Sequence, residues 1–203
     1  MLVASLLVYT GVWVPIGIVL VLGLRSSNRQ DLQAGLSGLL TAIGISEGCT
    51  QVLKLYVLRR RPNFFALCGF SVQQLKCTAP YLHVLEAQLS FPSGHSSLSF
   101  CGMTYLVLFG LGKLGLHRKN YTTSNRVLAL LCCFLPWGWA ACVGASRIVD
   151  WWHHPSDVLA GTILGTVVAI LSYHTCYPPV FSATAGTPLC AMATLEKLPS
   201  VHE

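Results

Sequence analysis

Five long apolar runs, separated by short polar segments, constrain the fold of this 203-residue chain more than any other feature. A helix needs about 20 mostly apolar residues to cross the hydrocarbon core of a bilayer, and each run has about that length. The runs cover residues 2–24, 36–58, 96–116, 127–145 and 157–177. We therefore predict an all-α protein, a polytopic transmembrane helical bundle with about five spans.

The composition supports a membrane protein and excludes several other classes. Only 10% of the residues are charged and 53% are hydrophobic, whereas a soluble domain carries about 25% charged residues. A disordered protein, a nucleic-acid-binding tail and an ordinary cytosolic enzyme are excluded, so the expected partner is the lipid bilayer and not nucleic acid. Pro178 and Pro179 end the last run because proline cannot continue a helix. We expect one membrane-embedded domain over residues 1–179 and a loose tail over residues 180–203.

Small residues inside the runs predict close packing of the helices. Gly44-x3-Gly48 and Gly161-x3-Gly165 have the spacing that lets membrane helices approach one another. Both motifs favour a compact bundle, and neither carries information about chemistry.

The polar segments fall on two sides of the predicted bundle. Residues 25–32 and 113–126 lie on one side, and residues 59–95 and 146–156 lie on the other. Lys and Arg are divided about equally between the sides, so the positive-inside rule does not orient the chain by counting alone. The second side collects nearly all of the polar residues that could perform chemistry.

Part of this second side suits an anion. It offers the cations Lys54, Arg61 and Arg147, together with Ser93 and Gly94 at the start of the third run. Free N–H groups and the dipole at a helix start favour an anion, and arginine forks match phosphate oxygens bidentately. Three cations are more than one carboxylate needs, so the constellation indicates a phosphoryl group.

Two histidines and an aspartate on the same side supply acid–base and nucleophilic groups. His153 and Asp157 are four residues apart, which places both on one face near a helix start. An aspartate bonded to one imidazole nitrogen leaves the other nitrogen free as a nucleophile or base. His95, on another helix, could supply a proton to a leaving group. Taken singly, each segment also has a structural explanation, such as an interfacial histidine, a loop or a helix cap at Ser93.

Together these segments resemble the three-part signature of the type 2 phosphatidic acid phosphatase superfamily. Lys-x6-Arg-Pro at 54–62, Pro-Ser-Gly-His at 92–95 and Ser-Arg-x5-His-x3-Asp at 146–157 match it without a substitution. Within the superfamily, the stretches at 61–65 and 177–179 are most similar to the diacylglycerol-pyrophosphate-phosphatase-like branch of the lipid phosphate phosphatases. The resemblance implies a PAP2/haloperoxidase-like core that hydrolyses phosphatidate and related lipid phosphomonoesters, with diacylglycerol pyrophosphate as a further candidate substrate.

The resemblance also implies a role for each matching residue. His153 would attack phosphorus and form a phosphohistidine, His95 would protonate the departing alcohol, and Asp157 would orient the nucleophile. Water would then cleave the phosphoenzyme. The residues that match the phosphate-binding positions are Lys54, Arg61, Ser93, Gly94 and Arg147. The family needs no metal or other cofactor for this reaction, and the sequence offers no carboxylate cluster to hold Mg²⁺.

Assigning three cations to phosphate orients the chain. Without Lys54, Arg61 and Arg147, the side that holds residues 25–32 and 113–126 is the richer in Lys and Arg, and we expect it to be cytoplasmic. The site would then face the lumen or the exterior, in the endoplasmic reticulum or the plasma membrane.

Two further sequence features depend on this orientation. Cys68 and Cys77 share the polar loop on the side of the site, and in an oxidising compartment they could form a disulfide. The sequon at Asn120 lies on the side expected to be cytoplasmic, where it would stay unused. A glycan at Asn120 would invert the predicted orientation.

Several alternatives stay open. Polyisoprenyl diphosphate or a soluble sugar phosphate could be the substrate, and loop residues 63–91 would decide between them. The family's membrane members usually have six spans, with three before the Lys-x6-Arg-Pro segment where this chain has two. A non-catalytic membrane interaction protein or an inactive shortened form is therefore a further hypothesis.

A channel or transporter would carry polar residues along several spans, whereas here Glu47 is nearly the only ionisable residue inside a predicted span. Homo-oligomerisation is also left open.

Glu47 is an ionisable residue inside a predicted span, and such residues are functional candidates. It lies on the same helix face as Gln51 and Lys54, and we interpret it as part of a polar stripe that leads to Lys54. Trp151 and Trp152 suit the membrane interface beside the site, or contact with a lipid substrate.

Overall fold

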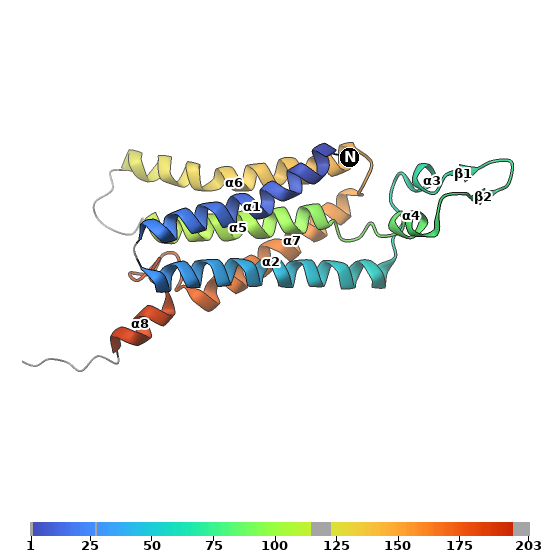
Figure 1. The fold of residues 1–203 in the computed structure, drawn as a ribbon. Coiled ribbons are helices and arrows are strands. Elements are labelled where there is room, and N and C mark those ends of the chain that lie inside the picture. The colour runs from blue at the N-terminus through green and yellow to red at the C-terminus, as the bar shows by residue number, and fades with distance from the viewer. Residues whose placement is uncertain (1, 27, 115–122, 197–203) are drawn as a thin grey trace, which may run out of the picture.

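The computed structural model describes residues 2–26, 28–114 and 123–196. Its elements in chain order are α1 (Leu2–Arg25), α2 (Arg29–Val57), α3 (Phe64–Leu67), β1 (Phe70–Ser71), β2 (Lys76–Cys77), α4 (Tyr81–Glu86), α5 (Gly94–Leu114), α6 (Thr123–Val149), α7 (Pro155–Cys176) and α8 (Leu189–Glu196). The long helices α1, α2, α5, α6 and α7 run side by side, as Figure 1 shows, and each covers one of the predicted apolar runs. The predicted all-α bundle is confirmed.

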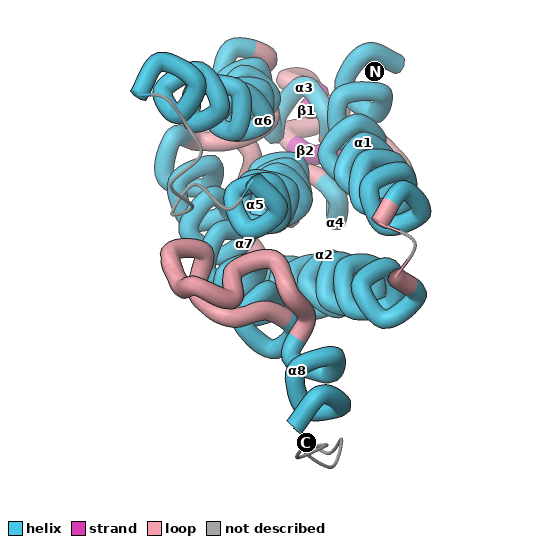
Figure 2. The backbone as a smooth tube through the Cα atoms, turned by 90° about the vertical axis from the view of Figure 1, so that its left-hand side faces the viewer, coloured by secondary structure: helices cyan, strands magenta, loops and turns pink. Residues whose placement is uncertain are grey.

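Helix α5 forms the centre of the bundle. Figure 2, which looks along the bundle, shows α5 surrounded by α1, α2, α6 and α7. Most of α5 is buried inside the protein, whereas α6 is largely exposed. Leu128, Leu131 and Leu135 of α6 are among the exposed apolar side chains, and in a bilayer such a face contacts lipid.

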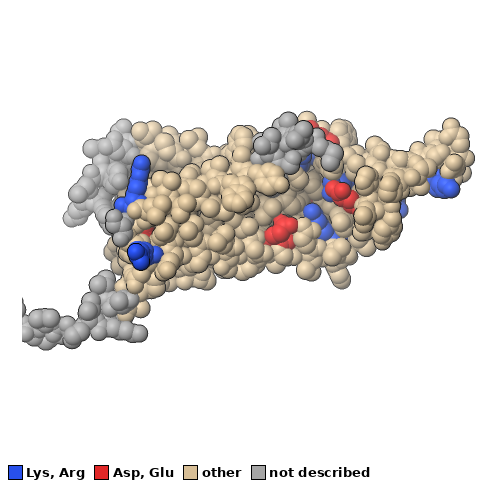
Figure 3. Space-filling model, in the orientation of Figure 1, with Lys and Arg blue, Asp and Glu red and all other residues tan. Residues whose placement is uncertain are grey.

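Length and hydropathy identify the membrane-spanning part. In the described part of the chain, α5, the segment Val127–Val149 of α6, and α7 are each long and apolar enough to cross a bilayer. On the face drawn in Figure 3, Lys and Arg gather toward the two ends of the bundle, and most of the surface between them is uncharged. The distribution is that of an integral membrane protein.

The glycine motif on α7 packs as predicted, and the one on α2 does not. A methyl group on Gly161 would overlap the Ser93 carbonyl oxygen, and one on Gly165 would overlap the Ser97 carbonyl oxygen, so α7 lies directly against α5. A methyl group on Gly44 or Gly48 would meet no atom within 4 Å. The interpretation of Gly44-x3-Gly48 as a helix contact is therefore wrong, because that face of α2 has no neighbour among the described residues.

The chain between α2 and α5 folds into a small cap at one end of the bundle. It holds α3, the antiparallel pair β1–β2 and α4, on the right in Figure 1. Phe70 pairs with Cys77 across the strands, and a disulfide joins Cys77 to Cys68. Helix α2 ends at Leu58, whose φ of 47° is left-handed and turns the chain out of the helix.

The opposite end of the bundle is closed by a buried ion pair. Asp31 of α2 is only 3% exposed and pairs with Lys113 of α5. The Tyr177 hydroxyl donates to the Asp31 carboxylate over 3.0 Å, and the Lys113 ammonium donates to the Gly186 carbonyl over 2.6 Å. These bonds join α2, α5, the end of α7 and the segment that follows it.

The C-terminal region differs from the loose tail that the sequence predicts. Residues 189–196 form α8, and the Gly186 carbonyl is bonded to Lys113. The sequon at Asn120 lies outside the described residues.

Candidate active site

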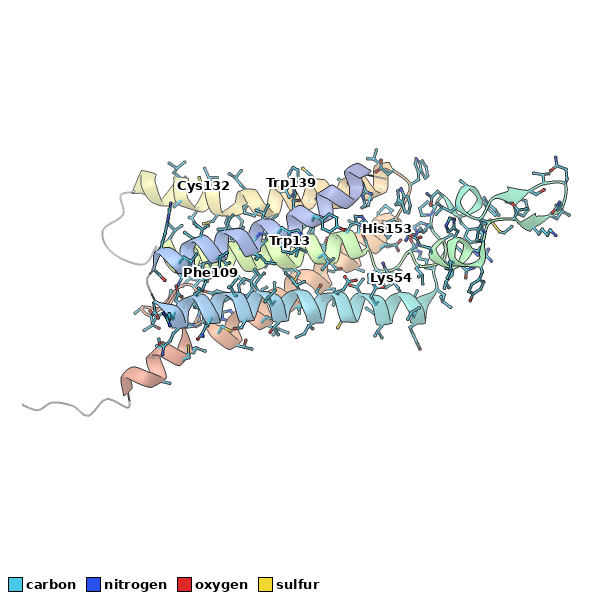
Figure 4. All side chains as sticks on the ribbon, viewed as in Figure 1. Trp13, Lys54, Phe109, Cys132, Trp139 and His153 are labelled. Carbon is cyan, nitrogen blue, oxygen red and sulfur yellow. A yellow bond between two sulfur atoms is a disulfide. The ribbon has the colours of Figure 1, made fainter. Side chains whose placement is uncertain are left out.

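All three signature segments lie at the end of the bundle that carries the cap. Helices α2 and α6 run toward this end, while α5 and α7 start from it, so residues far apart in sequence become neighbours. Figure 4 shows Lys54 and His153 both at this end, on α2 and just before α7. The structure thus brings together the residues that the sequence singles out.

One ring nitrogen of His153 is bonded, and the other has no hydrogen-bond partner among the described residues. Its side chain is almost fully buried, and Nδ1 lies 2.8 Å from the Ser90 carbonyl oxygen. A carbonyl oxygen only accepts, so Nδ1 carries the proton and Nε2 keeps its lone pair. Burial lowers the pKa of His153 below its usual value, although the Asp157 carboxylate opposes this. The imidazole is therefore neutral near pH 7, as a nucleophile or base must be.

Asp157 is fully buried and is held by several donors. Arg59 Nη1 lies 2.7 Å from Oδ1, Ser90 Oγ lies 2.6 Å from Oδ2, and the His154 amide donates to Oδ2 over 2.9 Å. The last bond also caps the start of α7.

The structure differs from the sequence hypothesis in the partner of His153. Nδ1 of His153 is 3.8 Å from the Asp157 carboxylate, which exceeds a hydrogen bond. The Ser90 carbonyl holds the imidazole instead, and the Ser90 hydroxyl holds the carboxylate.

Sequence reasoning missed Arg59 and Ser90. The only sequence signal for Arg59 is the run of three arginines at 59–61, of which one was assigned to phosphate. Ser90 has no signal of its own, because nothing in its residue type or spacing points to the site.

His95 faces His153 across a gap. It lies in the first turn of α5, and the centroids of the two rings are 6.4 Å apart, with their planes tilted by 57°. The two imidazoles therefore lie beside each other at the site, although they come from different elements. The geometry can place a nucleophile on one side of phosphorus and a proton donor on the other.

Two nearly buried guanidiniums flank the gap. Arg147 donates from Nη2 to Asp150 over 2.8 Å. Arg61 donates from Nε to the Glu86 carbonyl oxygen over 3.0 Å and stacks 4.7 Å from the centroid of Trp152. Each guanidinium has five N–H donors, and each keeps donors beyond the bonds that hold it to the described residues. Both can therefore bind phosphate oxygens from fixed positions.

The start of α5 completes the set of anion-binding groups. The Ser93 hydroxyl accepts from the Ser96 amide over 3.4 Å and caps the helix, and the Ser93 amide donates to the Asp157 carbonyl. A methyl group on Gly94 would lie 3.3 Å from the Lys54 ammonium. The absence of a side chain at Gly94 thus lets Lys54 approach the start of α5, so that the ammonium and the positive end of the helix dipole can attract the same anion.

Few acidic side chains lie around the space between His95 and His153. Among residues 2–26, 28–114 and 123–196, no three His, Cys, Asp or Glu side chains are grouped as metal ligands. Glu86 and Asp150 each face one guanidinium, and Asp157 pairs with Arg59. Glu47 and Glu86 also act on Lys54, and the three cations Lys54, Arg61 and Arg147 all act on His95.

The remaining residues singled out by sequence lie around the site. Gln51 donates to Glu47 on the exposed face of α2, one turn before Lys54, as the interpreted polar stripe predicts. Trp152 covers Arg61, and Trp151 is exposed. The Cys68–Cys77 disulfide lies in the cap.

Known proteins resemble this chain over most of its length. The PAP2 superfamily matches residues 35–179. Lipid phosphate phosphatase 1 of Arabidopsis thaliana is 36% identical over 174 residues, covering 82% of this chain and 52% of that protein. Probable diacylglycerol pyrophosphate phosphatase 1 of Schizosaccharomyces pombe is 33% identical over 169 residues, covering 78% and 59%.

A mammalian relative shows the same relation. Phospholipid phosphatase 1 of Rattus norvegicus is 35% identical over 136 residues, covering 62% of this chain and 46% of that protein. The chain spans between 46% and 59% of the length of these three relatives. No solved structure matches it.

Proposed function

The chain belongs to the PAP2 superfamily, and on that premise we propose that it is a membrane phosphatase that hydrolyses phosphatidate and related lipid phosphate monoesters. The observation that carries the proposal is the buried, neutral His153 that faces His95 across a gap flanked by cations. A phosphoryl group is the ligand that uses all of these groups at once.

The proposed reaction begins with attack on phosphorus. Lys54, Arg61 and Arg147 bind the phosphoryl oxygens with the start of α5, which draws electron density from phosphorus. The lone pair on Nε2 of His153 forms the N–P bond as the P–O bond to the lipid breaks. His95 gives its proton to the departing alkoxide, and the lipid leaves as an alcohol.

The second half of the reaction regenerates both histidines. His95, now neutral, takes a proton from water as the oxygen attacks phosphorus, and the N–P bond breaks to release inorganic phosphate. During the intermediate, the N–H on Nδ1 of His153 stays bonded to the Ser90 carbonyl. The buried Asp157 charge stabilises the positive charge that the phosphorylated imidazole carries.

The position of the site favours a lipid as the substrate. It lies at the helix ends, where the mostly uncharged surface of the bundle gives way to charged residues, so a phosphate head group can reach it while the acyl chains stay in the bilayer. One matched relative is named a diacylglycerol pyrophosphate phosphatase, which makes that lipid a second substrate to test.

The cap supports an orientation in which the site faces the lumen or the exterior. The Cys68–Cys77 disulfide lies at the same end as the site, and disulfides persist in oxidising compartments. We place the protein in the endoplasmic reticulum or the plasma membrane with this end away from the cytoplasm.

Phosphate release from a panel of esters tests the proposed function. Purified protein in detergent micelles is expected to release phosphate from phosphatidate in the presence of EDTA, because the site's own cations replace a metal ion. The panel adds diacylglycerol pyrophosphate, a sphingoid phosphate, a polyisoprenyl diphosphate and a soluble sugar phosphate.

Two variants serve as controls. His153→Ala should be inactive, and His174→Ala, which alters an exposed histidine of α7, should match the wild type. A strict requirement for Mg²⁺ would contradict the metal-free mechanism. A preference for the polyisoprenyl diphosphate or the sugar phosphate would contradict the substrate class.

A further inference from the structure

The three adjacent arginines after α2 make three different contacts. Arg60 lies 5.0 Å from the centroid of the Phe64 ring in the cap. Arg61 stacks on Trp152 beside the phosphate-binding groups. Arg59 reaches across to the first turn of α7, where Nη1 lies 2.7 Å from both the Ser156 hydroxyl and the Asp157 carboxylate.

Arg59 compensates a buried charge. Asp157 is fully buried, and a buried carboxylate is costly unless a cation or several donors hold it. His153 does not supply that cation, because burial keeps its imidazole neutral. The Arg59 guanidinium contacts Oδ1 of Asp157 over 2.7 Å, and the His154 ring contacts Oδ2 over 3.1 Å. Of these two contacts, Arg59 is the one whose charge is permanent.

The backbone of Arg59 holds the second partner of His153. The Arg59 carbonyl accepts from the Ser90 amide over 3.0 Å, and the Ser90 carbonyl in turn accepts from Nδ1 of His153. The Ser90 hydroxyl completes this hydrogen-bond network by donating to the Asp157 carboxylate. One residue therefore fixes both groups that set the orientation and protonation of the imidazole.

We propose that Arg59 is a positioning residue that acts on His153 through Asp157 and Ser90, and that it does not bind the phosphate. The inference rests on the proposed function, in which Nε2 of His153 attacks phosphorus. Arg59 holds the Asp157 carboxylate 3.8 Å from Nδ1 of His153. The Nδ1–H therefore remains hydrogen-bonded to the Ser90 carbonyl, and the ring keeps the orientation that points Nε2 at phosphorus.

The proposal predicts a change in protonation as well as in rate. Asp157 on α7, Arg61 after α2 and His95 on α5 face the His153 ring. Arg147 of α6 contacts His153 through its backbone carbonyl, and the neighbouring His154 ring lies 3.1 Å from the Asp157 carboxylate. Asp157 favours the protonated imidazole, and Arg61 opposes it. Removing the Arg59 charge leaves more of the Asp157 charge to act on the ring, so the pKa of His153 should rise.

The test compares Arg59→Gln with Arg60→Gln, which removes the same charge one residue away. Arg59→Gln should lower kcat by up to about 100-fold, the cost of displacing a reacting group by about 1 Å, with KM for phosphatidate unchanged. The acidic limb of kcat/KM plotted against pH should move to higher pH in Arg59→Gln. Arg60→Gln should match the wild type, and Arg59→Lys, which keeps the charge, should recover most of both properties.

Two results would overturn the inference. A rise in KM with an unmoved acidic limb would make Arg59 a phosphate ligand, and wild-type kinetics in Arg59→Gln would give it no role in the site. If Arg59→Gln does not fold, Arg59→Met, which keeps the apolar length of the side chain without its charge, replaces it in the same comparison, with the same expected shift and the same contradicting outcomes.

A readout without turnover separates this inference from the proposed function. The pH dependence of His153 modification by diethyl pyrocarbonate, measured by mass spectrometry, should shift to higher pH in Arg59→Gln and not in Arg60→Gln. An unshifted profile would contradict the inference. Failure of the wild type to hydrolyse any phosphate ester would contradict the proposed function. The pH dependence of His153 modification would still test the role of Arg59, because it needs no turnover.

Discussion

The two ends of the bundle each contain a buried aspartate paired with a cation from another segment. Asp31 pairs with Lys113 at one end, and Asp157 pairs with Arg59 at the other. Both carboxylates are almost fully buried, so each needs its partner for the same reason, the cost of an unpaired charge away from water.

The ends differ in what surrounds the pair. At the Asp31 end, the Lys113 ammonium also binds the Gly186 carbonyl, and the Tyr177 hydroxyl binds Asp31, so both charges of the pair are held by other protein groups. At the Asp157 end, further cations and two facing imidazoles lie beside the pair. A buried ion pair alone indicates stability, whereas three cations grouped around a pair of imidazoles indicate a site for an anion.

Strained backbone conformations also differ between the two ends of the bundle. Among the described residues, the non-glycine positions with positive φ are Leu58, Leu75 and Trp151, all at the end that carries the site, whereas Gly186 takes a positive φ at the other end. Such strain persists where the surrounding structure enforces it, often at functional sites.

The largest expected effect is on catalysis at the Asp157 end. His95→Ala should lower kcat for phosphatidate about 100- to 10,000-fold, the range for loss of a general acid, with the melting temperature unchanged. The loss should be much smaller with p-nitrophenyl phosphate, because its leaving group needs no proton. Equal losses on both substrates would show that His95 does not protonate the leaving group.

The next effect is on stability at the Asp31 end. Lys113→Ala leaves Asp31 buried without its cation and should destabilise the fold by about 3–5 kcal/mol. Activity per folded molecule should be retained, because the pair lies at the opposite end from the site. Chemical unfolding combined with active-site titration measures both quantities.

A double variant provides the control for Lys113. Asp31→Leu combined with Lys113→Met removes both charges and should recover much of the lost stability, since a buried pair can be replaced by apolar residues. Loss of activity per folded molecule in Lys113→Ala would contradict the division between the two ends.

A smaller effect concerns pH. Burial lowers the pKa of His153 from its ordinary value of 6.5, so the imidazole stays neutral and nucleophilic to lower pH than a free histidine does. The acidic limb of kcat/KM, which reports the free enzyme, should therefore lie below pH 6.5. A limb above pH 7 would mean that the imidazole is stabilised in its charged form.

The smallest effect is at Leu58. Its φ of 47° is left-handed, which costs an L-residue about 1–2 kcal/mol, and glycine adopts it freely. Leu58→Gly should raise the stability by about 1 kcal/mol after the greater entropy of the unfolded glycine is subtracted. A loss of stability would show that the Leu58 side chain contributes more than the strain costs.

The long helices and the signature residues could be predicted from the sequence because both depend on local information. Apolar runs define the helices within a few residues, and their alternating direction brings residues 54–62, 92–95 and 146–157 to one end. The spacing of Gly161 and Gly165 also predicts a close helix contact, which the structure confirms against α5. The Gly44-x3-Gly48 motif has the same spacing but contacts no helix among the described residues. Spacing alone therefore does not predict which face of α2 has a neighbour.

The network behind His153 could not be predicted, because it depends on the path of the chain between α2 and α5. Ser90 acts partly through its backbone carbonyl, which any residue possesses, and Arg59 is distinguished from Arg60 only by where each side chain points. The Asp31–Lys113 pair joins residues 82 positions apart, outside any motif. Tertiary contacts of this kind leave no local pattern.

Trapping the phosphoenzyme tests the central claim most directly. Rapid acid-free quenching of the enzyme with ³²P-labelled phosphatidate, followed by peptide mass spectrometry, should place the label on His153 through a bond that is labile in acid and stable in base. The label should be absent from His153→Ala and present in His174→Ala. Label on any other residue, or turnover with no covalent label in the first cycle, would contradict the account.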